Sequence, residues 1–109
     1  MATLLATAIA FSCPHGLLPL QTNSIGPAAA VALAREDPKA RPFVVSATLA
    51  PVDRERGPIA KRQCGATVWQ RTVVVYIRLR AFGGSQSLSS RVDFVGRTRG
   101  GYRVWQVVH

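Results

Sequence analysis

The stretch that decides the fold is the last part of the chain, Val92-Asp93-Phe94-Val95-Gly96-Arg97-Thr98-Arg99-Gly100-Gly101-Tyr102-Arg103-Val104-Trp105-Gln106-Val107-Val108. Its two halves are rich in β-branched and aromatic residues, and an Arg-Gly-Gly sequence separates them. Because such residues favour strands and glycine favours tight turns, this pattern predicts a β-hairpin. A hairpin is only marginally stable by itself, so other elements must cover its apolar face.

The register of the hairpin follows from the length of its turn. We expect Arg97 to pair with Tyr102, which puts residues 99–100 at the tip. Phe94 then lies opposite Trp105, and this aromatic pair packs on one face of the hairpin. The other expected pairs are Val92 with Val107 and Val95 with Val104.

Two runs upstream show the alternation of apolar and polar residues that is typical of strands. The first covers residues 43–49. The second covers residues 66–80 and is long for one strand, so we expect a bulge near residues 70–71, or two shorter strands. Residues 52–58 are charged and contain glycine and proline, which predicts an exposed loop. The residues expected to share an apolar face are Phe43, Val45, Ala47 and Leu49 in the first run and Val73, Val75, Ile77 and Leu79 in the second.

A helix is predicted over residues 24–36, where most residues have high helix propensity. Ser24 can cap the first free N–H groups, and Pro27 is tolerated in the first turn. Pro38 disfavours the helical conformation at the residue before it, so the helix should end near Glu36. The sequence is apolar on all sides of this helix, which indicates that it is buried or lies close to a sheet.

Together these elements predict an α+β fold, with one Ala-rich helix packed on a four-stranded antiparallel sheet that ends in the β-hairpin. We expect residues 24–109 to form one domain, preceded by an apolar N-terminal segment and linker, residues 1–23. The apolar run that ends at Cys13 is too short to span a bilayer. It is either the apolar part of an export leader or anchor, or a first strand or helix packed in the core. No Lys or Arg precedes it, as one would in a typical leader.

The two cysteines, Cys13 and Cys64, leave the compartment open. Their spacing matches no zinc or redox motif. In a cytoplasmic protein both would be small buried thiols, whereas in a protein exported intact they could form one disulfide. If a leader that contains Cys13 is removed, Cys64 is left alone.

The chain is strongly basic, with a net charge of +9. From Lys61 to the C-terminus there are nine basic residues and one acidic residue, so this half carries +8. A basic half is typical of proteins with an anionic partner such as an acidic protein, nucleic acid or a membrane surface. The alternative is that the charge serves only solubility.

The residues that usually perform catalysis are scarce. The histidines are His15 and His109, and neither has a nearby acid or a third metal ligand in the sequence. Asp93 lies among basic residues, and we expect it to pair with a neighbouring Arg. No Gly-rich phosphate-binding loop is present. We therefore expect a protein that is not an enzyme and that has no metal or small-molecule cofactor.

The best candidates for a binding site are Arg and Tyr side chains on the predicted sheet. They form two groups, Tyr76, Arg78 and Arg80 on one strand and Arg97, Arg99 and Arg103 around the hairpin tip. We expect a non-catalytic binding or accessory domain. The alternative is a basic nucleic-acid-binding module, in which bases stack on exposed aromatic rings and Arg binds phosphates.

Overall fold

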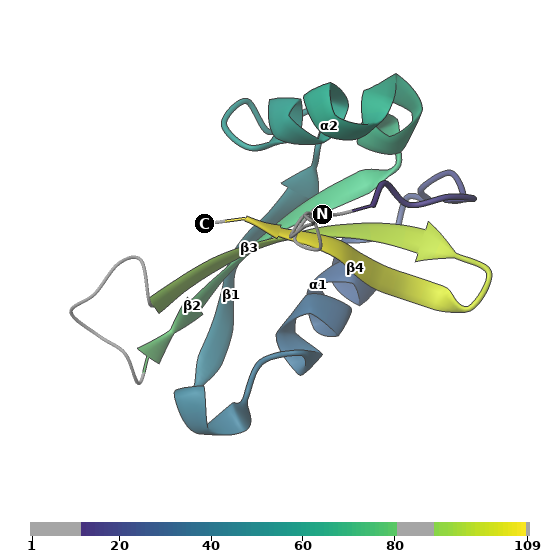
Figure 1. Ribbon diagram of the computed structural model, residues 1–109. Coiled ribbons are helices and arrows are strands. Elements are labelled where there is room, and N and C mark those ends of the chain that lie inside the picture. The colour runs from purple at the N-terminus through teal and green to yellow at the C-terminus, as the bar shows by residue number, and fades with distance from the viewer. Residues whose placement is uncertain (1–11, 81–88, 109) are drawn as a thin grey trace, which may run out of the picture.

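The computed structural model describes residues 12–80 and 89–108, and it contains two helices and a four-stranded antiparallel sheet (Figure 1). The strands lie in the order β1-β2-β3-β4, so each strand pairs with its neighbour along the chain. The expected α+β class and the antiparallel sheet are confirmed, but the described residues form two α-helices instead of one. The elements are α1 (Ile25–Ala34), a short 3-10 helix η2 (Pro38–Ala40), β1 (Pro42–Leu49), α2 (Gly57–Gln70), β2 (Thr72–Leu79), β3 (Ser90–Thr98) and β4 (Gly101–Val108).

Helix α2 corrects the prediction for the middle of the chain. Its two ends, residues 57–58 and 66–70, were expected to lie in an exposed loop and in the first part of a long strand. Pro58 occupies the first turn of the helix, where its missing N–H needs no partner. Ala60, Cys64 and Val68 recur at a four-residue spacing, which is a helical period that the strand interpretation overlooked. A kink at Gly65, with a φ of 89°, interrupts the helix, and the strand alternation begins only at Thr72.

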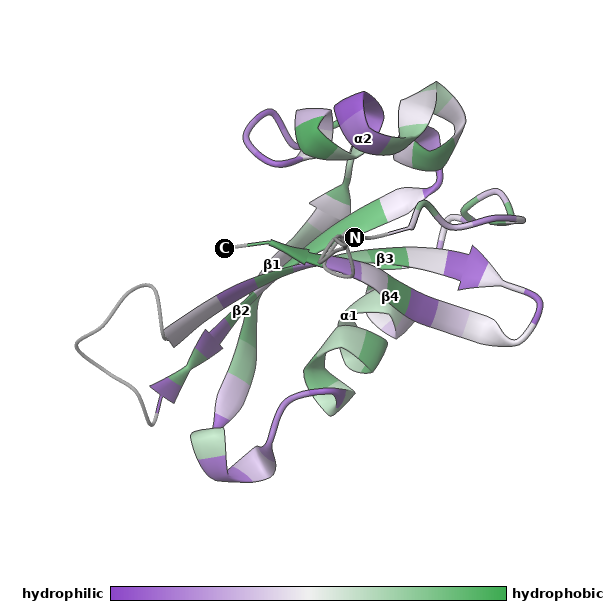
Figure 2. Ribbon diagram, in the orientation of Figure 1, coloured by the Kyte–Doolittle hydropathy of each residue, from purple (hydrophilic) through white to green (hydrophobic). Residues whose placement is uncertain are grey.

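The two helices lie on opposite faces of the sheet, and each face has its own core (Figure 1). On the α1 face, the apolar side of β2 is confirmed, with Val73, Val75, Ile77 and Leu79 all buried. On the α2 face, Phe94 and Val74 are buried against Ala60. Figure 2 shows apolar residues on the central strands and on α1, and polar residues at the hairpin tip.

A β-bulge in β1 changes the face predicted for that strand. The pairing with β2 shifts between Val44 and Ser46, so Val45 has no partner and is 55% exposed. Val44 and Ala47 both pack against the α1 core instead. The residues Phe43, Val45, Ala47 and Leu49 therefore do not form one apolar face as predicted, because the extra residue reverses the alternation before Ala47, which does reach the core.

The hairpin has the predicted tip and a second bulge farther along. Arg97 pairs with Tyr102, and Val95 pairs with Val104, as expected. The register then shifts, so that Phe94 pairs with Gln106 instead of Trp105. The same shift pairs Val92 with Val108 rather than with Val107.

The expected contact between the two aromatic residues nevertheless exists. The ring centroids of Phe94 and Trp105 are 5.3 Å apart, at an interplanar angle of 54°. Trp105 is the extra residue of the bulge, and it keeps its side chain on the α2 face with Phe94.

Residues 12–23, which we call the N-terminal strap, lie against the hairpin. Leu18 forms a bridge with Arg97, and its N–H donates to the Arg97 carbonyl at 2.7 Å. Leu17 is buried over Gly96, where a Cβ atom would come within 2.6 Å of the leucine side chain. Glycine at position 96 therefore lets the strap approach the strand.

The strap leads into α1 through Ser24, whose role differs from the expected cap. Its hydroxyl makes no capping bond to the helix. Instead it accepts a hydrogen bond from the Gln21 N–H at 2.8 Å and forms another with the Tyr102 hydroxyl at 2.8 Å. The backbone of Ser24 is already helical, which does not suit a cap. Among the described residues, no helix has the length and apolar character needed to cross a bilayer.

Candidate functional site

The six basic and aromatic residues predicted as a site lie at two opposite ends of the sheet. Strand β2 is antiparallel to β3, so Arg78 lies beside Ser90, whereas Thr72 lies beside Gly96 near the hairpin tip. The group of Tyr76, Arg78 and Arg80 is therefore separated from the tip of the hairpin by most of the length of β3 (Figure 1). The structure does not bring the two groups together into one surface.

The Tyr76 hydroxyl makes a hydrogen bond inside the fold. Its hydroxyl donates to Asp53 Oδ2 at 2.6 Å. Burial, followed by this bond, raises the pKa of Tyr76 above its usual range. Burial by itself would raise the pKa of Asp53, but the hydrogen bonds from Tyr76 and from backbone N–H groups bring it below its usual value. Tyr76 therefore holds the loop before α2 against the sheet and does not serve as a stacking surface.

The two arginines near Tyr76 differ in their surroundings. Arg80 places its guanidinium over the Phe43 ring, 4.2 Å from the centroid, and its backbone N–H donates to the Arg41 carbonyl. Arg78 is exposed. Arg80 thus covers an aromatic ring of the edge strand, which is a packing role as much as a binding role.

The hairpin tip presents its arginines on a backbone with internal hydrogen bonds. The Thr98 hydroxyl donates to the Gly101 carbonyl at 2.7 Å and accepts from the Gly100 N–H at 3.2 Å. Arg99 and Arg103 are exposed. These bonds across the turn reduce the number of conformations in which the two guanidinium groups are presented.

Arg97 has a different function from the other two arginines at the tip. Its Nη1 donates to the Pro19 carbonyl at 3.1 Å, and Arg71 Nη1 likewise donates to the Leu17 carbonyl at 2.6 Å. Both guanidinium groups therefore hold the N-terminal strap in place. Two of the three predicted residues of this group, Arg99 and Arg103, remain directed to solvent.

A pocket of about 450 Å³ lies between the strap and β4. Its lining combines a guanidinium and an imidazole with apolar side chains and a disulfide. The lining residues are Ser12, Cys13, Pro14, His15, Leu17, Thr98, Arg103, Val104 and Trp105. We call the hairpin tip, residues 97–103, together with this pocket the hairpin end.

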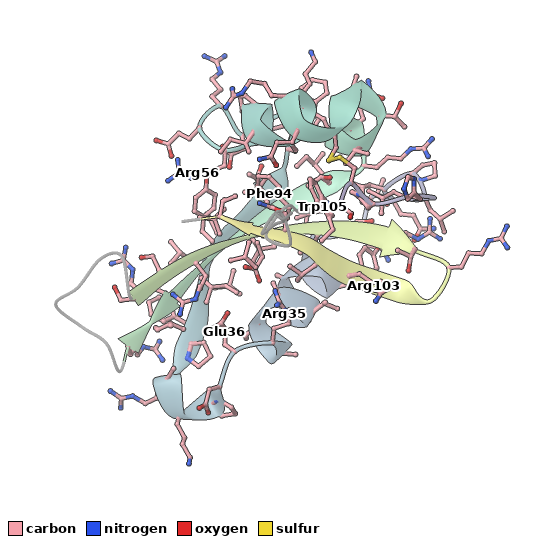
Figure 3. The ribbon with its side chains drawn as sticks, viewed as in Figure 1. Arg35, Glu36, Arg56, Phe94, Arg103 and Trp105 are labelled. Atoms are coloured by element: carbon pink, nitrogen blue, oxygen red, sulfur yellow. A yellow bond between two sulfur atoms is a disulfide. The ribbon has the colours of Figure 1, made fainter. Side chains whose placement is uncertain are left out.

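Two successive hydrogen bonds fix the Trp105 side chain, which forms one wall of the pocket. Trp105 Nε1 donates to the Thr72 hydroxyl at 3.2 Å, and that hydroxyl donates to the Val68 carbonyl of α2 at 2.7 Å. In Figure 3, Trp105 lies beside Phe94, and Arg103 lies on the hairpin. The aromatic wall is therefore preorganised by β2 and α2.

A disulfide between Cys13 and Cys64 closes the same region and ties the strap to α2. The Cα atoms are 5.5 Å apart, and the bond spans 51 residues of sequence. Of the interpretations that the sequence left open, the structure has the disulfide rather than two buried thiols. This bond also places His15, two residues after Cys13, beside the hairpin.

The hairpin end carries positive charge, and its own residues include no acid. Residues 94–109 contain no Asp or Glu, and neither does the strap. Four of the five acidic residues lie before Lys61, and the fifth, Asp93, is completely buried. Unpaired guanidinium groups on a fixed scaffold attract anions over distances of about 10 Å at moderate salt.

The contribution of the strap to this site was not predicted, because residues 1–23 were expected to be an apolar N-terminal segment and a linker. The pair of cysteines was the available signal, since a Cys13–Cys64 bond would have brought the strap to the folded domain. Among the residues that the structure describes, no three His, Cys, Asp or Glu side chains gather as a metal site would require. Comparison of the chain with protein-family models, curated proteins and solved structures gives no match.

Proposed function

We propose that this protein is a non-catalytic binding domain that holds an acidic segment of a partner protein at its hairpin end. The observation that carries the proposal is the pair of exposed arginines, Arg99 and Arg103, beside a pocket walled by Trp105. Guanidinium groups form strong hydrogen bonds with carboxylates. The apolar wall suits a large apolar side chain next to those carboxylates.

The placement of the aromatic residues supports a protein partner over nucleic acid. Stacking of bases requires aromatic faces that are open to solvent beside basic groups. The Tyr76 and Tyr102 hydroxyls are hydrogen bonded inside the fold, and the Phe43 ring lies under Arg80. Tyr76, the ring expected to stack bases, and also Tyr102 and Phe43 therefore already have contacts within the fold.

Binding would be measured with a fluorescently labelled peptide of Glu and Leu residues. The test variant is Arg99→Glu with Arg103→Glu, and the control is Lys39→Glu with Arg54→Glu, which changes the net charge equally at exposed positions away from the hairpin. We expect the test variant to bind at least about tenfold more weakly, because two charge-assisted contacts become repulsive. The control variant should bind the peptide only slightly more weakly than the wild type, because only its net charge has changed.

The same proteins would be titrated with a short random-sequence DNA duplex across a salt series. Tight binding of DNA with a steep dependence on salt, together with weak binding of the peptide, would favour the nucleic-acid module instead. Equal losses in the test and control variants would show that the hairpin end is not the site.

We also propose that the protein works in an oxidising compartment, outside the cytoplasm. The disulfide supports this, since such bonds are rare in reducing cytoplasm. If a leader is removed, the cleavage must leave Cys13 in the mature chain. Intact mass after alkylation under non-reducing conditions would test this. A mature chain that lacks Cys13, or that takes up two alkyl groups without reduction, would contradict it.

A further inference from the structure

Asp93 is a buried acid whose carboxyl group has no hydrogen-bond partner in the described part of the chain. It lies in the middle of β3, between Val75 of β2 and Val107 of β4, and it is 0% exposed. Neither of its carboxyl oxygens has a hydrogen-bond partner among the described residues. The expected hydrogen-bonded pair with a neighbouring Arg is therefore absent in this part of the structure.

The side chain of Asp93 belongs to the α1 face of the sheet. Its neighbour Phe94 packs in the α2 core and Val95 packs in the α1 core, so the alternation along β3 directs Asp93 toward α1. The residues of α1 that are buried on this face are Ala28 and Ala32, which are small and allow a close approach. A water shell for a carboxylate cannot enter such a contact unless the helix moves.

Three charged groups surround Asp93. Arg35 and Glu36 follow the last turn of α1, beneath the sheet (Figure 3), and Arg91 lies two residues away on β3. Burial raises the pKa of Asp93 to about 6; Arg35 opposes this rise, Glu36 adds to it and Arg91 opposes it. The carbonyl groups at the end of α1 also carry partial negative charge, which disfavours a carboxylate nearby.

We propose that Asp93 makes the contact between α1 and the sheet sensitive to protons, with the last turn of α1 closed over the neutral carboxyl group and opened when that group ionises. The reason is that an ionised carboxylate without partners is far more costly to bury than a neutral acid. Opening admits water and lets the Arg35 guanidinium reach the carboxylate.

Hydrogen exchange of the α1 amides, corrected for the intrinsic effect of pH, measures this opening. Because the group binds its proton more tightly in the closed state, closure is favoured in acid and is weakened as the pH rises through about 6. Between about pH 4.5 and 7.5 the opening constant should rise roughly thirtyfold for the wild type. It should rise little in Asp93→Asn, whose side chain cannot ionise.

Glu55→Gln is the matched control, because Glu55 is an exposed acid before α2, and it should respond to pH as the wild type does. Carboxyl ¹³C titration by NMR gives a second measurement that needs no change at Asp93. Arg35→Gln should raise the Asp93 midpoint, and Glu36→Gln should lower it. An Asp93 midpoint at or below 3.8, or exchange in α1 that depends on pH equally in Asp93→Asn, would overturn the proposal.

Discussion

On the face of the sheet that α2 covers, side-chain hydrogen bonds and a disulfide join the elements, whereas on the α1 face the buried carboxyl group of Asp93 has no hydrogen-bond partner among the described residues. Trp105 donates to Thr72, Tyr76 donates to Asp53, and a disulfide ties the strap to α2. The α1 face is held by small apolar contacts and by the hydrogen bond between Ser24 and Tyr102. We infer that the two cores of this domain respond to different conditions, the α2 face to reductant and the α1 face to protons.

Removal of the disulfide should have the largest effect and should fall on the α2 face. With Cys13→Ser and Cys64→Ser, we expect the free energy of unfolding to fall by about 3–4 kcal/mol, since the bond closes a long loop in the unfolded chain. Urea unfolding measures the loss. Hydrogen exchange should increase in α2 and the strap before it increases in α1, and a uniform increase would contradict the distinction between the faces.

Trp105→Ala should cost about 3 kcal/mol, because it removes a large side chain that packs on Phe94. Trp105→Phe is the control. It keeps an aromatic ring but loses the hydrogen bond to Thr72, so we expect a cost of about 1 kcal/mol. Thermal unfolding of Trp105→Ala that matches the wild type would show that the aromatic pair does not stabilise the α2 face.

The α1 face should make the protein more stable in mild acid. The pKa of Asp93 is about 6 in the folded protein, above its ordinary value of 3.8. The stabilisation is therefore complete below about pH 4 and is lost as the pH rises through about 6, an effect of about 2–3 kcal/mol. Asp93→Asn should be more stable than the wild type at pH 7 by about 1–2 kcal/mol, since it buries an amide rather than a charge. If it is less stable at pH 7, Asp93 has a partner when ionised.

The hydrogen bond between Tyr76 and Asp53 should show the opposite dependence on pH and the smallest effect. Tyr76→Phe removes the bond, and we expect a cost of about 1 kcal/mol at pH 7. The pKa of Asp53 is lowered in the folded protein, so its contribution is present above about pH 4 and is lost as the pH falls. The difference between Tyr76→Phe and the wild type should shrink in acid. An undiminished difference would mean that packing, not the bond, is responsible.

Much of the fold could be predicted because it depends on neighbouring residues along the chain. The tip of the hairpin, the buried side of β2 and the helix that ends before Pro38 all follow from local alternation, turn residues or helix propensity. The second helix could also have been recognised from the spacing of its apolar residues. The bulges at Val45 and Trp105 could not, since a bulge depends on how a strand meets its partner.

The candidate site could be predicted only in part. The hairpin arginines were identified from their composition and turn, and Arg99 and Arg103 are exposed there. Their separation from Arg78 and Arg80 follows from the antiparallel order of β2 and β3. Arg97 was expected to be at the binding surface, but it also binds the strap carbonyl of Pro19.

By itself, the sequence determined where most of the strands and the first helix would form and which half of the chain would be basic, because local periodicity and charge need no distant partner. Three further features depend on the tertiary structure: the strap completes the pocket, Cys13 and Cys64 form a disulfide, and Asp93 is buried beneath α1. Each of these depends on contacts between segments far apart in the chain. Burial and hydrogen bonding are properties of such contacts, and no single stretch of sequence contains them.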